Sequence, residues 1–94
     1  MRRVIAPSAA TDLADILQFI ARDRPAAALA VVDRPEAASR RIAERPHVGR
    51  ARPDIGHQLR AHSAGRYLII YRVEPDRVLI VRHFHGARRL SGPD

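Results

Sequence analysis

The chain has 94 residues, enough for one small domain, and alanine accounts for 16 of its 43 apolar residues. It has no cysteine, which excludes disulfides and thiolate metal sites. Its 17 arginines, with no lysine and 10 acidic residues, give a net charge of +7 when histidine is neutral. Such an excess predicts a polyanionic partner: nucleic acid, the ribosome or an acidic protein. No apolar run is long enough to span a membrane, so we expect a cytoplasmic protein with no membrane partner.

The chain begins with a predicted strand and a predicted helix. Residues 2–6 favour a short strand, which Pro7 ends. Ser8 occupies the position expected of a helix N-cap, and apolar residues then recur at helical spacing. We therefore expect an amphipathic helix over residues 9–22.

A second helical segment is predicted over residues 26–44, but it contains an interruption. Pro35 has no backbone N–H to donate, and it disfavours helical geometry in Arg34. Apolar residues on both sides of Pro35 still continue one buried face. We expect this segment to kink, or to stop and restart, near residue 33.

The second half of the chain predicts a loop followed by three strands. Residues 45–57 contain two prolines and two glycines, which is typical of a loop. Strand-like runs follow at residues 58–62, 66–73 and 77–84, joined by turns so short that neighbouring strands must be antiparallel. Residues 86–94 form a polar tail, and the whole chain is expected to be one domain.

The predicted order of elements is strand, helix, helix, strand, strand, strand. Because helices that follow one another in sequence pack on one side of a sheet, this order predicts an α+β fold. We expect two helices on one face of a mainly antiparallel four-stranded sheet. Strict alternation along the last strand would put Val78, Ile80, Arg82 and Phe84 on one face of the sheet and Leu79, Val81 and His83 on the other. His85 would share the face of His83.

Several short motifs, in this order, resemble the ParE-type toxins of the RelE/ParE toxin–antitoxin superfamily. The motifs are ATDLADI at 10–16, FI at 19–20, RPHVGR at 45–50, LR at 59–60, RYLIIYRV at 66–73 and RHFHGAR at 82–88. Each motif is weak alone, but together they cover nearly the whole chain. The fold of that family agrees with the predicted order of elements.

The resemblance implies a toxin of a type II toxin–antitoxin system, such as those that stabilise plasmids. Its partner would be a cognate, ParD-like antitoxin in a hetero-oligomer. ParE-type members are understood to block DNA gyrase, without turnover, whereas RelE-type relatives cut mRNA on the ribosome. A third alternative is a degenerate, non-toxic binding module, because one fold can carry different functions.

The nuclease alternative requires a general base, a general acid and cations around the scissile phosphate. The candidates for this chemistry are His83, His85, Arg60 and Arg82. In nuclease relatives the last segment supplies a catalytic histidine and a terminal tyrosine, and the resemblance aligns these positions with Phe84 and His85. This departure favours gyrase inhibition over mRNA cleavage.

A binding surface for the target or the antitoxin is expected where cations gather on and after the strands. The candidates are Arg60, Arg66, Arg72, Arg82, His85 and Arg88. Arginines on strands need solvent or an anionic partner around their charged ends. His47, His57 and His62 are scattered around the predicted loop, so neither a metal site nor a cofactor is expected.

Overall fold

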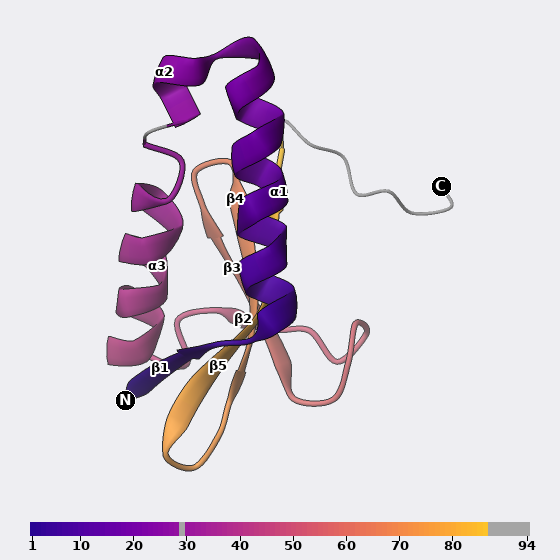
Figure 1. Ribbon diagram of the computed structural model, residues 1–94. Helices are drawn as coiled ribbons and strands as arrows, with labels where there is room; N and C mark the ends of the chain where they lie inside the picture. The colour runs from indigo at the N-terminus through magenta and orange to yellow at the C-terminus, as the bar shows by residue number, and fades with distance from the viewer. Residues whose placement is uncertain (29, 87–94) are drawn as a thin grey trace.

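Five strands and three helices make up the computed structural model, which describes residues 1–28 and 30–86. In chain order they are β1 (Arg2–Ile5), α1 (Pro7–Asp23), α2 (Pro25–Ala28), α3 (Asp33–Glu44), β2 (Arg50–Ala51), β3 (Leu59–Ala64), β4 (Tyr67–Val73) and β5 (Arg77–His85) (Figure 1). The strands form one sheet in the order β1-β5-β4-β3-β2. Strand β1 is parallel to β5, and the other neighbours are antiparallel. The predicted tail at 86–94 lies outside the described residues except for Gly86.

The α+β fold class is confirmed, with a fifth strand that the sequence did not predict. Strand β2 consists of two residues and pairs antiparallel with Arg60 and Ala61 of β3. It lies within the segment that the prolines and glycines mark as a loop. Two residues are too few to show a strand period, so this edge strand leaves no pattern in the sequence.

Helix α1 begins two residues earlier than its hydrophobic period predicts. Its first residue is Pro7, and Ala6 is the N-cap without a side-chain hydrogen bond. Proline suits this first position because its missing N–H would have no partner in the helix. Ser8 is therefore not the N-cap, and its hydroxyl instead donates to the carbonyl of Val81 in β5, at 2.7 Å.

The second helical segment stops and restarts, which confirms the interruption expected near residue 33. Helix α2 ends at Ala28 and α3 begins at Asp33. Pro35 is buried in the first turn of α3, where the helix needs no N–H from it. The first helical hydrogen bond at this end runs from the Glu36 N–H to the Val32 carbonyl, at 3.0 Å.

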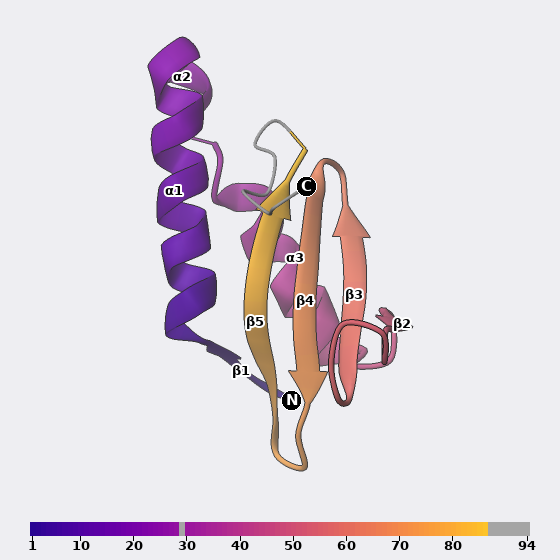
Figure 2. The ribbon, with the colours of Figure 1, turned by 90° about the vertical axis from the view of Figure 1, so that its right-hand side faces the viewer.

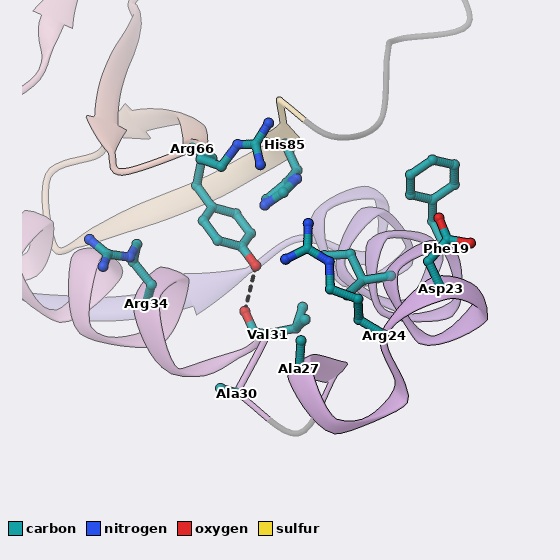
Figure 3. A pocket seen from close by; sticks show the side chains of 11 residues that line it. Phe19, Asp23, Arg24, Ala27, Ala30, Val31, Arg34, Arg66 and His85 are labelled. Carbon is teal, nitrogen blue, oxygen red and sulfur yellow. Dashed lines mark hydrogen bonds between the residues drawn. The ribbon is translucent and has the colours of Figure 1, made fainter.

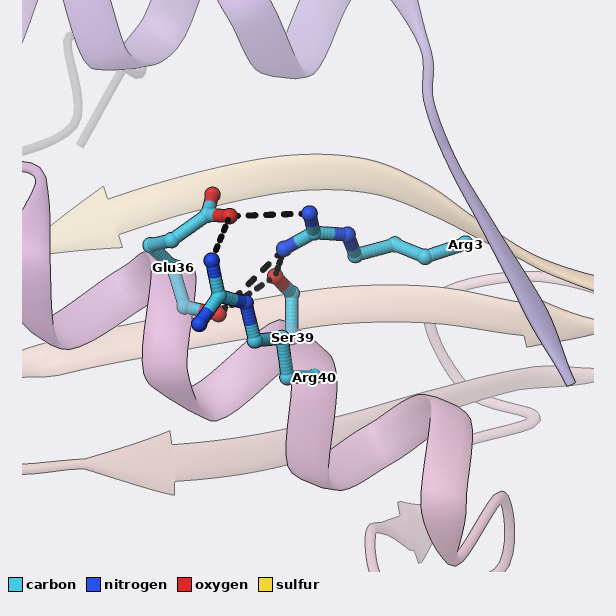
Figure 4. Close-up of polar contacts among 4 residues, drawn as sticks. All are labelled: Arg3, Glu36, Ser39 and Arg40. Atoms are coloured by element: carbon cyan, nitrogen blue, oxygen red, sulfur yellow. Dashed lines mark hydrogen bonds and ion pairs between the residues drawn. The ribbon is translucent and has the colours of Figure 1, made fainter.

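Arg3 fixes α3 to the edge of the sheet (Figure 4). One terminal nitrogen donates to the Glu36 carboxylate at 2.8 Å, and the other donates to the Ser39 hydroxyl at 2.7 Å. Arg40 approaches the same carboxylate at 3.3 Å. The hydrogen bond from Arg3 lowers the pKa of Glu36, so the carboxylate stays charged and the contact between β1 and α3 is kept.

The main core lies between the helices and one face of the sheet. Figure 2 shows α3 behind the long strands and α1 running alongside β5, with no helix over the face turned to the viewer. The buried cluster consists of Ala9, Ala38, Ile42, Ala43, Ile69, Tyr71, Val78 and Ile80. A second cluster joins Ile16, Val31 and Tyr67 between α1, the α2–α3 connection and β4. The opposite face of β3, β4 and β5 has no helical cover in the part of the chain that the structure describes.

A β-bulge in β5 overturns the expected alternation of its side chains. Ile80 pairs with Tyr71, but Arg82 pairs with the preceding residue Ile70, so Val81 has no partner in β4. Such an extra residue shifts the phase of a strand by one. Beyond it, His83 lies on the helix-facing side with Ile80, as the Ile69–His83 pairing also shows.

The same bulge sends Arg82 and Phe84 to the uncovered face, away from Val78 and Ile80. The expectation that these four residues share a face is wrong for this reason. The expectation that His83 and His85 share a face is confirmed, and that face is the one toward the helices.

Candidate functional site

Arg60 is tied to the loop that precedes β2. Its Nε donates to the Gly49 carbonyl at 3.0 Å, and Nη2 donates to the His47 carbonyl at 3.3 Å. Arg60 pairs with Tyr71 in the sheet, and paired residues point to the same face, so the Arg60 side chain leaves the strand on the helix-facing side. Arg82 lies on the opposite side, and the two cations that the nuclease alternative needs do not converge.

Arg82 is bound within the fold by Asp12 of α1. Its Nε donates to Asp12 Oδ2 at 2.7 Å, and its Nη2 donates to Oδ1 at 3.0 Å. Its guanidinium carbon also lies 5.0 Å from the centre of the Phe84 ring. Arg82 thus holds α1 against β5, at the point where β1 has ended.

His83 is buried, with 2% of its surface exposed. Its Nδ1 lies 3.0 Å from the Ala9 carbonyl, which can only accept, so Nδ1 carries the hydrogen. Burial lowers the pKa of His83, and the contacts with Ala9 and Asp12 oppose that shift. A neutral side chain closed off in this way cannot reach an external phosphate or hydroxyl.

Acidification from pH 7 to pH 5 is expected to lower the free energy of unfolding. Burial lowers the pKa of His83, and also of His62 and His85, so the folded chain binds fewer protons than the unfolded chain below the ordinary histidine pKa of about 6.5. Stability is therefore complete above that pH and falls as the pH drops through the folded pKa values. Each group contributes a slope of up to about 1.4 kcal/mol per pH unit.

Urea unfolding at several pH values measures this slope. The variant His83→Gln is expected to have a shallower slope than the parent chain between pH 7 and pH 5, whatever its stability at pH 7. An equal slope in the two chains would show that His83 does not take up a proton on unfolding in this range.

His85 and Arg66 lie together at the C-terminal end of β5, near the turn between β3 and β4. The His85 ring meets the Tyr67 ring edge to face, with centroids 4.6 Å apart and planes at 72°. Partial burial lowers the pKa of His85, and the charge of Arg66 adds to that effect. His85 therefore favours the neutral form beside a permanent cation.

These residues line a hollow of about 500 Å³ between the α1–α2 turn and the end of the sheet. Its wall includes the Tyr67 ring, whose hydroxyl donates to the Val31 carbonyl at 2.7 Å (Figure 3). The basic side chains Arg24, Arg34 and Arg66 also line it. Arg24 and Arg34 were not among the candidate residues, because neither carries a motif and each comes from a different helical segment.

Arg72 lies on the uncovered face of the sheet, paired with Leu59 on one side and Leu79 on the other. Its Nε and Nη2 each lie 3.4 Å from the His57 carbonyl, the long limit of a hydrogen bond. Among the candidate cations, Arg60 and Arg82 are bound within the fold, whereas Arg72 has only these long contacts and Arg66 forms no ion pair with residues 1–28 or 30–86. Arg88 lies outside the described residues.

The described residues contain neither a metal-binding cluster nor a membrane-spanning helix. No three side chains among histidine, aspartate and glutamate in residues 1–28 and 30–86 come together as a group that could hold a metal ion. Nor does any described helix combine the length and the apolar character needed to cross a bilayer.

This fold is shared with a solved toxin–antitoxin protein. A chain of the chromosomal ParDE toxin–antitoxin system from P. aeruginosa superposes with a TM-score of 0.78 and 20% sequence identity, over 90% of this chain and 95% of that one. Among the curated proteins, none matches the sequence. Residues 4–90 match the family described as ParE toxin of type II toxin-antitoxin system, parDE, and the chain belongs to that family. The resemblance drawn from the sequence motifs is confirmed.

Proposed function

We propose that this ParE-family toxin acts on DNA gyrase by binding, and that a cognate antitoxin neutralises it. The observation that carries the proposal is the burial of His83 beneath α1, because it removes the best acid–base candidate from reach of RNA. The other candidates are separated as well, since Arg60 and Arg82 start from opposite faces of the sheet. Inhibition of gyrase is what the ParE resemblance implies, and it requires no catalytic group.

The uncovered face of the sheet supports a partner that is both apolar and acidic. Leu68, Leu79 and Phe84 are half-buried on this face, where Leu79 pairs with Arg72. The net charge of +7 favours a negatively charged partner in general. An acidic amphipathic segment that folds on this face would cover the apolar side chains and neutralise Arg72.

The function is tested by incubating the full chain with gyrase, relaxed plasmid and ATP, and in parallel with ribosomes translating a reporter mRNA. We expect loss of supercoiling or trapped cleaved DNA, with the mRNA intact, and relief of both effects by an equimolar cognate antitoxin. Cleaved mRNA with normal supercoiling would contradict the proposal and support the ribonuclease alternative. Normal supercoiling together with intact mRNA would support the non-toxic binding module instead.

A further inference from the structure

The hollow at the α1–α2 turn concentrates positive charge that the described fold does not neutralise. Arg24, Arg34 and Arg66 line it, and none of them forms an ion pair with residues 1–28 or 30–86. Asp23 also lines the hollow, but Figure 3 shows its carboxylate beside Phe19 and away from the Arg24 guanidinium. Like charges gathered in one concave site repel one another unless an anion joins them.

Two of the guanidinium groups flank His85. Figure 3 shows Arg24 extending into the hollow toward His85, with Arg66 on the other side of His85. Arg34 points away from His85 and lies against Gly65. Arg24 and Arg66 thus bring positive charge to both sides of His85, while Arg34 adds charge from the rim.

The remainder of the wall is apolar and aromatic. Ile20, Ala27 and Val31 contribute aliphatic surface, and the edge-to-face pair of Tyr67 and His85 forms a rigid aromatic side. A volume of about 500 Å³ lies within the range of small-molecule sites and leaves much more room than one inorganic anion fills. The lining therefore matches a ligand with a charged end and an organic body.

We propose that this hollow binds a small organic phosphate of nucleoside monophosphate size, with Arg24 and Arg66 on the phosphate and the ring system against Tyr67 and Val31. A phosphate is favoured over a single carboxylate because its two negative charges match the two guanidinium groups on either side of His85, whose N–H forks fit its oxygens. This site is separate from the uncovered face assigned to the antitoxin, and it does not depend on the gyrase proposal.

The test is a titration of the isotope-labelled full chain with AMP, followed by amide NMR shifts. We expect saturable shifts at Tyr67 and His85, weaker binding of inorganic phosphate at the same amides, and no saturation by adenosine. Arg24→Gln and Arg66→Gln are each expected to weaken AMP binding by about tenfold, the usual effect of losing a charge-assisted hydrogen-bonded contact. Arg22→Gln is the matched control, because it removes the same charge from exposed α1 surface outside the hollow.

Four outcomes would overturn the proposal. The first is the absence of saturation by AMP at low millimolar concentration, and the second is equal affinity for AMP and adenosine. The third is equal affinity for AMP and for glutarate, a dicarboxylate without a phosphate. The fourth is an equal loss of AMP affinity in Arg24→Gln, Arg66→Gln and Arg22→Gln. Equal losses would mean that AMP affinity depends only on the net charge of the chain. A single-stranded oligonucleotide that displaces AMP from the same amides at far lower concentration would assign the site to nucleic acid. Unchanged spectra outside the hollow establish that the variants are folded.

Discussion

Replacing Gly49 with alanine is expected to be the most damaging single methyl addition in this domain. A Cβ at Gly49 would lie 2.5 Å from the Tyr71 hydroxyl, 2.7 Å from its ring carbon Cε1 and 2.9 Å from the Ala61 carbonyl. None of these atoms can move easily, because Tyr71 is fully buried and Ala61 belongs to the sheet. We expect a loss of about 3 kcal/mol in the free energy of unfolding, measured by urea denaturation, a large part of the stability of a small domain.

The hydroxyl of Tyr71 explains why this contact is so tight. It accepts a hydrogen bond from the Gly49 N–H at 2.8 Å and donates to the Pro46 carbonyl at 2.7 Å. Tyr71 thereby holds the loop between α3 and β2, to which Arg60 also binds. Tyr71→Phe alone should cost about 1–3 kcal/mol, because both backbone groups lose their partner.

A double variant separates the steric effect from the loss of hydrogen bonds. Tyr71→Phe removes the atom nearest the added methyl, so the cost of Gly49→Ala with Tyr71→Phe should be clearly less than the sum of the single costs. Gly86→Ala is the control, because its Cβ would approach no atom closer than 3.6 Å. Additive costs, or a Gly49→Ala chain as stable as Gly86→Ala, would contradict this account of the loop.

The sequence predicts those elements whose signals are local. The helical period of α1, the β-branched and aromatic run of β4 and the position of Pro35 each depend on neighbouring residues, and the corresponding elements are present. The two residues of β2 and the bulge at Val81 do not follow from such signals. Both depend on how one strand pairs with another, and the bulge alone reverses the predicted face of every later residue in β5.

The candidate site shows the same division between local and distant information. The sequence identifies the cations of the strands, but it does not show which of them find a partner within the fold. Arg82 is bound by a residue 70 positions earlier, while Arg66 shares its hollow with Arg24 and Arg34 from two other segments. A long side chain on a strand therefore indicates a binding surface only after its contacts inside the fold are known.

Replacing Asp12 with alanine is expected to lower the free energy of unfolding by about 2–4 kcal/mol. The Asp12 carboxylate is 14% exposed and accepts three hydrogen bonds, two from the Arg82 guanidinium and one from the backbone N–H of His83, the last at 2.9 Å. Its loss leaves the Arg82 guanidinium and the backbone N–H of His83 without their acceptor. Helix α1 would then keep its apolar contacts with β5 but lose the polar contact that fixes its position.

Three further variants test this explanation through the relative size of their losses in the free energy of unfolding. Asp12→Asn keeps an acceptor for His83 and should cost less than Asp12→Ala, and Arg82→Ala should also cost less because the carboxylate still serves His83. Asp76→Ala should have little effect, since its ion pair with Arg2 is long, at 3.9 Å, and largely exposed. If Asp12→Ala were as stable as Asp76→Ala, the contact would not hold α1. If the predicted order is observed, a loss of toxicity on replacing Arg82 reflects the position of α1, and Arg72 and Arg66 become the residues whose replacement tests the contacts with the antitoxin or the target.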